Sequence, residues 1–155
     1  MSMGGLIVVR RVAEQDSDDL LAWRNDEATR RSSKNTAPVP LADHLRWLAA
    51  SLSNPDRLMF VGLLDDDKIG TVRFDRKPNA ADSYTVSVTV NPAFRGRGHG
   101  KELLGAAIEE IGPCALEAEI RDGNEASRKI FEACGFHCVG PAPDKGYSLF
   151  RTVIS

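Results

Sequence analysis

A glycine-rich segment carries the densest chemical signal in this sequence. It reads Val88-Thr-Val-Asn-Pro-Ala-Phe-Arg95-Gly96-Arg97-Gly98-His99-Gly100-Lys101. Alternate glycines let backbone N–H groups turn toward one point and let a ligand approach closely. The helix that we expect next adds a partial positive charge at its start, and Arg95, Arg97 and Lys101 add formal charges. This combination predicts a cradle for a pyrophosphate.

Two common phosphate-binding loops differ from this segment. No Gly-Lys-Ser/Thr sequence closes it, which excludes a Walker loop. It follows a predicted β-meander instead of opening a βαβ fold, so it matches the dinucleotide fingerprint poorly. A nucleotide-binding module of the Rossmann type stays open as an alternative, as does a tight strand–helix connection that binds nothing.

Hydrophobic periodicity predicts the elements that position this segment. We expect seven strands, at residues 6–11, 58–64, 68–75, 84–90, 115–120, 136–139 and 147–153. We expect four helices, at 16–30, at 41–52, from the glycines to 111, and at 124–134. Leucines at helical spacing give the second helix a predicted buried stripe, namely Leu41, Leu45, Leu48 and Leu52. The order βααβββαβαββ is typical of a mixed α/β domain with one partly parallel sheet.

The composition is that of one ordinary globular domain. The chain has 155 residues, a net charge of −2 and 42% hydrophobic residues, so we expect a single domain over 1–155 with residues 1–5 as a tail. The charge argues against a non-specific nucleic-acid or membrane-surface binder, and no apolar run is long enough to cross a bilayer.

Without a secretory signal or a CxxC pair, the three cysteines predict reduced, packed thiols in a cytoplasmic protein. The acids at 65–67 predict a solvated turn, because calcium loops space their acids at alternate positions.

Two motifs resemble those of the GNAT superfamily of acyl-CoA-dependent N-acetyltransferases. Arg95, Gly98 and Gly100 fill that family's Arg/Gln-x-x-Gly-x-Gly/Ala pattern, and the stretch from Asn124 to Phe136 is similar to its second block. Their order and separation also match, and the resemblance covers about residues 6–153. It implies an α/β (α+β) fold of the GNAT type, a central mixed, mostly antiparallel sheet of about seven strands flanked by four helices. It also implies acetyl-CoA as co-substrate and no metal.

The resemblance further implies which residues hold this co-substrate. Backbone amides of the loop would hold the CoA pyrophosphate, at Gly96, Arg97, Gly98, His99, Gly100 and Lys101. The backbone of Val88 and Val90 would pair with the pantetheine arm like an added strand, and one N–H there would stabilise the developing oxyanion. Asn124 would reach the pantetheine, with helix capping as its alternative role. Ser127 and Arg128 would contact the phosphates or the adenosine end.

The second motif departs from the family at Phe131, where many members place a tyrosine acid. Phe131 belongs to the expected cofactor-binding residues, but phenylalanine has no proton to give. Tyr84 and Tyr147 are therefore the candidate acids, with packing as the alternative for both. An acid is not essential, because thiols have a pKa of about 8.5 and a thiolate leaves tolerably by itself.

The candidate bases are His44, Glu119 and Asp82. His44 shares a helix face with Trp47, and the ordinary histidine pKa of about 6.5 suits a base at neutral pH. Packing or surface roles are the alternative for His44, and an ion-paired strand position is the alternative for Glu119. Since no base is strongly placed, the sequence favours an amine of low pKa, such as an α-amine near 7.7–8.0, over a lysine side chain.

Two segments in the first third of the chain resemble one subgroup of the family. Trp23-Arg24-Asn25 and Asp43-His44-x-x-Trp47 are similar to ribosomal-protein alanine and amino-sugar-nucleotide acetyltransferases. The resemblance implies acceptor contacts at Arg24, Asn25 and Trp47, with helix-surface pairing as the alternative. We expect an N-acetyltransferase that moves the acetyl group directly to a primary amine of a small molecule or a peptide N-terminus, with a homodimer as one expected state. A catalytically silent acyl-CoA sensor is the alternative.

Overall fold

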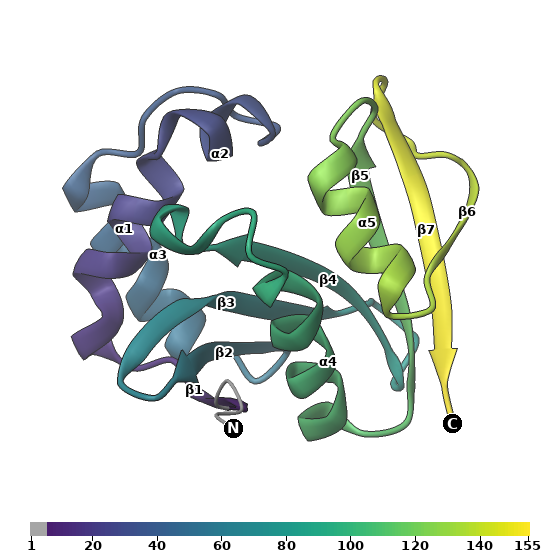
Figure 1. The fold of residues 1–155 in the computed structure, drawn as a ribbon, viewed down its shortest axis with the longest axis horizontal. Coiled ribbons are helices and arrows are strands. Elements are labelled where there is room, and N and C mark those ends of the chain that lie inside the picture. Colours follow the sequence, from purple (N-terminus) through teal and green to yellow (C-terminus); the bar gives the residue numbers. More distant parts are fainter. Residues whose placement is uncertain (1–5) are drawn as a thin grey trace.

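The computed structural model describes residues 6–155 as a seven-stranded sheet with helices on both faces (Figure 1). The strands are β1 (Ile7–Arg11), β2 (Arg57–Leu64), β3 (Asp67–Arg76), β4 (Ser83–Val90), β5 (Cys114–Arg121), β6 (His137–Pro141) and β7 (Tyr147–Ile154). The α-helices are α1 (Ser17–Asn25), α2 (Glu27–Arg31), α3 (Leu41–Leu52), α4 (His99–Ile111) and α5 (Glu125–Ala133). Short 3-10 turns stand at Glu14–Asp16 and Pro92–Phe94. The predicted tail at 1–5 lies outside the described residues.

The sheet is mixed and mostly antiparallel, which confirms the predicted fold class. Its order is β1-β2-β3-β4-β5-β7-β6, and only β4 and β5 run parallel. Their ladder is short, since it joins residues 83–85 to residues 115–117 and then ends. Beyond it the two strands diverge, as Figure 1 shows. The middle of the sheet therefore contains a strand edge without a neighbour.

The two faces of the sheet carry different helices, because side chains of a strand alternate between faces. On β2, Phe60 points into the larger core, which it shares with Leu103 of α4 and with α5. The next residue, Met59, points into a smaller core with Leu20 of α1 and Leu48 of α3. Each such fully buried apolar side chain stabilises the fold by about 1.5–3 kcal/mol. Helices α4 and α5 thus cover one face, and α1 and α3 the other.

The prediction of one continuous helix at 16–30 is wrong, because the structure has two helices there, α1 and α2. The helix is broken at Asp26, whose backbone is extended (φ −57°, ψ 137°) and whose side chain accepts a hydrogen bond from the Thr29 N–H. Aspartate competes with helix backbone in this way and is a preferred N-cap. The described residues therefore form five α-helices where four were predicted.

The leucine stripe predicted for α3 is confirmed at Leu48 and Leu52, which pack in the smaller core, but is wrong at Leu41 and Leu45. Leu41 and Leu45 are 57% and 50% exposed, whereas His44, Leu48 and Ser51 are the buried residues of this helix. The face is rotated because two polar side chains find partners inside: the His44 ring contacts Ser17 and the Ser51 hydroxyl accepts a hydrogen bond from Arg57. Satisfied polar groups can be buried, so apolar periodicity alone misplaced the face.

Two further sequence expectations have outcomes among the described residues. All three cysteines are free thiols. Cys114 is buried and Cys134 is half-buried, but Cys138 is exposed, so the prediction of a packed thiol is wrong for Cys138. Within residues 6–155, no helix combines the length and the apolar character that crossing a bilayer requires.

Candidate active site

Hydrogen bonds at the two ends of β4 show which way its backbone groups point. The Asn91 N–H donates to the Ile69 carbonyl on the β3 side at 2.6 Å, whereas the Asp82 carbonyl accepts from the Ala115 N–H on β5 at 2.8 Å. Backbone groups of successive strand residues point to opposite edges. Odd-numbered residues of β4 therefore bond toward β3, and even-numbered residues point toward β5.

The even-numbered valines lie where β5 has already diverged. Among the described residues the β4–β5 ladder ends with the pair Thr85 and Glu117, so beyond it the N–H and C=O groups of Val88 and Val90 face the opening between the strands. An exposed edge of this kind accepts an extended chain as an additional strand. The structure thus gives Val88 and Val90 the backbone orientation that their predicted pantetheine contact needs.

The start of α4 lies directly after this strand and is suited to bind an anion. Gly98 is its N-cap in a left-handed conformation (φ +80°), and no side chain caps the helix. The first N–H groups of a helix lack partners within it, so those of His99, Gly100 and Lys101 are available. A Cβ on Gly96 or Gly98 would meet nothing within 4 Å. These two glycines are needed for their positive φ, and open space surrounds them.

Gly100 has a different role from the other two loop glycines. A Cβ there would lie 2.4 Å from Cδ1 and 2.7 Å from Cγ1 of Ile130 on α5. The absence of a side chain at Gly100 therefore lets α4 pack closely against α5. Its backbone N–H remains part of the first turn of α4.

The basic side chains of the loop are not equally available to a phosphate. The Arg95 guanidinium donates to Asp26 at 2.6 Å and to the Thr29 hydroxyl at 2.7 Å, across the α1–α2 junction. This hydrogen bond lowers the pKa of the Asp26 carboxyl. Arg97 lies over the Phe94 ring and Lys101 is exposed. The sequence predicted that Arg95 contacts the cofactor. In the structure its guanidinium instead binds Asp26 and Thr29.

The second motif forms α5 and its cap. Asn124 Oδ1 accepts from the Ser127 N–H at 3.2 Å, and Arg128 pairs with acidic neighbours on its own helix. Phe131 is buried and packs edge-on against Phe136, with the ring centroids 5.0 Å apart. The structure therefore places Asn124 and Ser127 at the start of α5 but does not bring the Phe131 ring to the surface.

A cavity of about 440 Å³ lies on the other face of β4. It is lined by α1, α3, the segment between them and the outward residues of β3 and β4, including Leu20, Trp23, Arg24, Asn35, Val39, Asp43, His44, Trp47, Met59, Thr71, Arg73, Ser87 and Thr89. Three predicted residues, Arg24, His44 and Trp47, therefore meet in one cavity. Asn25 does not line it, because its amide bonds both backbone groups of Val39 and so holds the wall in place.

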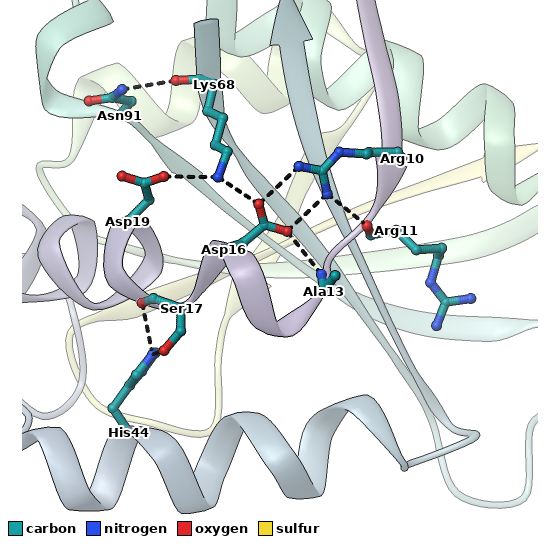
Figure 2. A network of polar contacts seen from close by, with 9 residues as sticks. All are labelled: Arg10, Arg11, Ala13, Asp16, Ser17, Asp19, His44, Lys68 and Asn91. Atoms are coloured by element: carbon teal, nitrogen blue, oxygen red, sulfur yellow. Dashed lines mark hydrogen bonds and ion pairs between the residues drawn. The ribbon is translucent and has the colours of Figure 1, made fainter. Parts of the chain in front are cut away.

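His44 has one ring nitrogen already committed. Its Nε2 lies 3.0 Å from the Ser17 carbonyl and 3.1 Å from the Ser17 hydroxyl (Figure 2). A carbonyl only accepts, so the contact with it is a hydrogen bond in the tautomer with the hydrogen on Nε2, and in that tautomer Nδ1 is the ring nitrogen that accepts. The ring is buried and stacks on the Trp47 ring, with the ring centroids 6.0 Å apart. A base function of His44 therefore has to use Nδ1.

The remaining acid–base candidates lie in separate places. Glu119 on β5 pairs with Lys34 at 2.9 Å, and the Tyr147 hydroxyl on β7 accepts from Arg121 at 2.9 Å while Lys34 lies over its ring. Glu119 and Tyr147 thus share one polar cluster with Lys34. Tyr84 is in the larger core, on the face opposite the cavity. Asp82 is exposed before β4.

A buried ion network that the sequence did not reveal supports the helix α1 (Figure 2). Asp16, with no exposed surface, accepts from Arg10 at 2.9 Å and from the Ala13 N–H at 2.9 Å, and lies 2.7 Å from Lys68. Burial acts to raise the pKa of Asp16, but the hydrogen bonds from Arg10 and Lys68 outweigh it and hold the pKa well below its usual range. Lys68 in turn accepts from the Asn91 side chain at its carbonyl. The network therefore links β1, α1 and β3 to the start of the glycine loop; the sequence pointed to Asp16 only as a helix cap.

Comparison with known proteins agrees with this geometry. The profile of the acetyltransferase (GNAT) domain family matches residues 7–137. A ribosomal protein bS18 alanine N-acetyltransferase of Haemophilus ducreyi is 27% identical over 104 residues, which are 64% of this chain and 72% of that protein. An uncharacterised protein of Mycobacterium leprae is 37% identical over 57 residues. That match covers 37% of this chain and only 16% of the longer relative.

Solved structures share the fold at low sequence identity. A crystal structure of the aminoglycoside acetyltransferase AAC(6')-Ib with coenzyme A superposes with a TM-score of 0.80 at 16% identity, covering 95% of this chain and 94% of that one. Within residues 6–155, no group of three or more His, Cys, Asp or Glu side chains is arranged to hold a metal ion. Metal independence itself stays a prediction.

Proposed function

Because the chain belongs to the acetyltransferase (GNAT) domain family, we propose that it transfers the acetyl group of acetyl-CoA directly to a primary amine. The observation that carries the proposal is the open edge of β4. Its even-numbered backbone groups face the gap to β5, the uncapped start of α4 follows it, and its opposite face lines the cavity. One strand thus borders a site for an extended thioester and a site for an acceptor.

The chain's own residues fit acetyl-CoA at this edge. When bound, acetyl-CoA supplies a thioester whose carbonyl carbon bonds to the amine nitrogen as its carbon–sulfur bond breaks, and the proton lost by the amine balances the thiolate. The first N–H groups of α4 hold the pyrophosphate. The Val88 and Val90 backbone holds the pantetheine, and an N–H of this edge stabilises the oxyanion, a contact typically worth 10²–10³ in rate.

The candidates for proton transfer are one residue of the cavity wall and two residues of the separate polar cluster around Lys34. His44 lines the cavity and offers Nδ1 as the base. Glu119 is held by Lys34, which makes it a weaker candidate for this role. Tyr147 keeps a hydroxyl hydrogen to donate, because it uses its oxygen to accept from Arg121. A thiolate with a pKa of about 8.5 leaves tolerably even without that acid.

The acceptor is a small molecule or the N-terminus of a peptide. The cavity is at the lower end of the range for small-molecule sites, and the H. ducreyi relative is named for a ribosomal-protein alanine. An amino-sugar nucleotide remains a second acceptor type favoured by the sequence. The homodimer and the cytoplasmic location remain predictions.

A silent acyl-CoA sensor is the second candidate function. The observation that favours it is the burial of Phe131, where the family commonly has a tyrosine acid. Calorimetry with acetyl-CoA, together with thiol release over a panel of amines, separates the two functions. We expect binding and turnover of at least one amine. Tight binding without turnover of any amine would establish the sensor, and thermal stabilisation by NAD but not by CoA would contradict both.

A further inference from the structure

Two arginines from different elements line the acceptor cavity. Arg24 comes from α1 and Arg73 from β3. The one carboxylate in the cavity wall, Asp43, is exposed and pairs with Arg46 on its own helix. The cavity therefore has an excess of positive charge that its wall does not neutralise.

Arg24 has an unsatisfied donor on the cavity side of α1. Its Nη2 donates to the Asn35 carbonyl at 3.0 Å, but its Nη1 is buried and has no hydrogen-bond partner. Among residues 6–155 it forms no ion pair with a carboxylate. A buried charged donor without a partner is costly, so the position favours an acceptor group that the protein does not supply.

Arg73 is only partly neutralised. Its Nε lies 3.0 Å from Asp75, and its Nη2 donates to the Ser87 hydroxyl at 3.4 Å. Asp75 is shared with Arg57 at 2.6 Å. Burial lowers the pKa of Arg73, and the nearby charges of Arg57 and Arg24 act in the same direction against the opposing effect of Asp75. One carboxylate thus stands among three guanidinium groups.

We propose that Arg24 and Arg73 together bind an oxyanion, a carboxylate or a phosphate, that belongs to the acceptor. The proposal rests on the proposed function and specifies its substrate class. Planar guanidinium groups bind such anions in pairs of hydrogen bonds. Arg73 reaches Ser87 on β4, the strand whose edge would hold the thioester. The other wall is apolar, with Leu20, Trp23 and Met59. The acceptor is therefore a small amine that carries an anion and an apolar or sugar portion.

The experiment compares amines that differ only in the anion. One arm uses the twenty L-amino acids and their amides, and the other uses glucosamine 6-phosphate and glucosamine. Binding to the protein saturated with CoA is measured by calorimetry, and thiol release is measured with acetyl-CoA. Amidation lowers the pKa of the amine and so raises its reactive neutral fraction. A preference for the free acid therefore cannot arise from amine protonation.

We expect the preferred anionic amine to bind about 10- to 100-fold more tightly than its neutral counterpart, as for a lost hydrogen bond to a charged group. Arg24→Gln should remove most of that preference, and so should Arg73→Gln. Arg30→Gln is the matched control, because Arg30 also bonds the segment after α2 (the Thr36 carbonyl, 3.2 Å) but does not line the cavity.

The results separate this inference from the proposed function. Acetyl-CoA affinity should be unchanged in the arginine variants, which verifies their fold. If the anionic amine binds more tightly, Arg24→Gln abolishes this preference and no amine is turned over, the inference is supported and the proposed acetyltransferase function is contradicted. Equal binding of the neutral and anionic amines, no binding in either arm, or a preference unaffected by both arginine variants overturns the inference, whatever the turnover. The arm that binds distinguishes a carboxylate from a phosphate.

Discussion

The two sides of β4 are built from different materials. On the edge toward β5, the candidate cofactor site consists of backbone groups: the valine amides and the first turn of α4. On the face toward α1 and α3, the candidate acceptor cavity consists of side chains, among them Arg24, His44 and Arg73. Backbone groups are fixed by φ and by strand pairing, whereas these side chains are fixed by contacts with distant residues. Outside the loop glycines, we therefore expect side-chain substitutions to affect the second site more than the first.

One ion pair and one hydrogen bond join the two regions. Arg95 of the loop bonds Asp26 at the α1–α2 junction, and Asn91 bonds Lys68, which belongs to the network around Asp16. The helices that line the candidate acceptor cavity are thus attached to the loop that would hold the pyrophosphate.

The largest effect is expected in the buried ion network around Asp16, which supports α1 beside the cavity. Asp16→Asn leaves Arg10 and Lys68 without their buried carboxylate, so the free energy of unfolding should fall by about 3–5 kcal/mol in urea titrations. Asp43→Asn is the control, since its exposed pair with Arg46 should contribute under about 1 kcal/mol. Equal losses in the two variants would mean that the Asp16 network does not hold this region.

The same network predicts a pH dependence. The folded-state pKa of Asp16 is depressed, so its contribution is complete above the unfolded-state value of about 3.9 and is lost as the pH falls toward the lower folded value. The stability difference between the wild type and Asp16→Asn should therefore shrink on acidification from pH 5 to pH 2. A constant difference across this range would contradict the assignment.

The backbone-built site is tested by charge at Gly98. Asparagine and aspartate both tolerate a positive φ, so Gly98→Asn and Gly98→Asp form a matched pair. A carboxylate near the pyrophosphate should weaken acetyl-CoA binding by about 100-fold relative to asparagine, with less effect at high salt. Calorimetry measures both dissociation constants, and indistinguishable values would place the pyrophosphate elsewhere.

A substitution at Gly100 should lower the stability of the fold but leave the affinity for acetyl-CoA nearly unchanged. Gly100→Val forces a side chain against Ile130 and should lower the unfolding free energy by about 2 kcal/mol. Combining it with Ile130→Ala should restore part of this loss, while acetyl-CoA affinity stays within about threefold of the wild type. A large loss of affinity in the folded double variant would show that Gly100 serves the ligand directly.

The smallest effect is expected where the two regions meet. Asp26→Asn keeps the cap of α2 but frees Arg95, so stability should change by under about 1 kcal/mol. Acetyl-CoA should bind about two- to threefold more tightly at low salt, because the released charge lies on the loop. Glu27→Gln, which breaks only the surface pair with Arg31, is the control. No change in affinity would make the Arg95 contact purely structural.

Much of the fold and about half of the candidate site could be predicted from the sequence. Alternation in β4 and the glycines before α4 identified the strand and the loop, and the resemblance to the GNAT family pointed to the backbone groups at Val88 and Val90. The prediction failed where polar residues decided the structure: the helix break at Asp26 and the buried face of α3 around His44. Apolar periodicity does not register a polar side chain that finds a partner elsewhere in the fold.

Local sequence by itself determined the elements that depend on neighbouring residues. Positive φ at Gly96 and Gly98 and the two-residue period of β4 are properties of short segments, so the glycine turn and the strand follow from them. The open edge of β4 does not, because it depends on where β5 diverges from it. Only the tertiary structure brought Arg24 together with Arg73, and Asp16 together with Lys68. These contacts depend on how separate elements pack, because side chains distant in the chain meet only when the sheet and its helices have assembled.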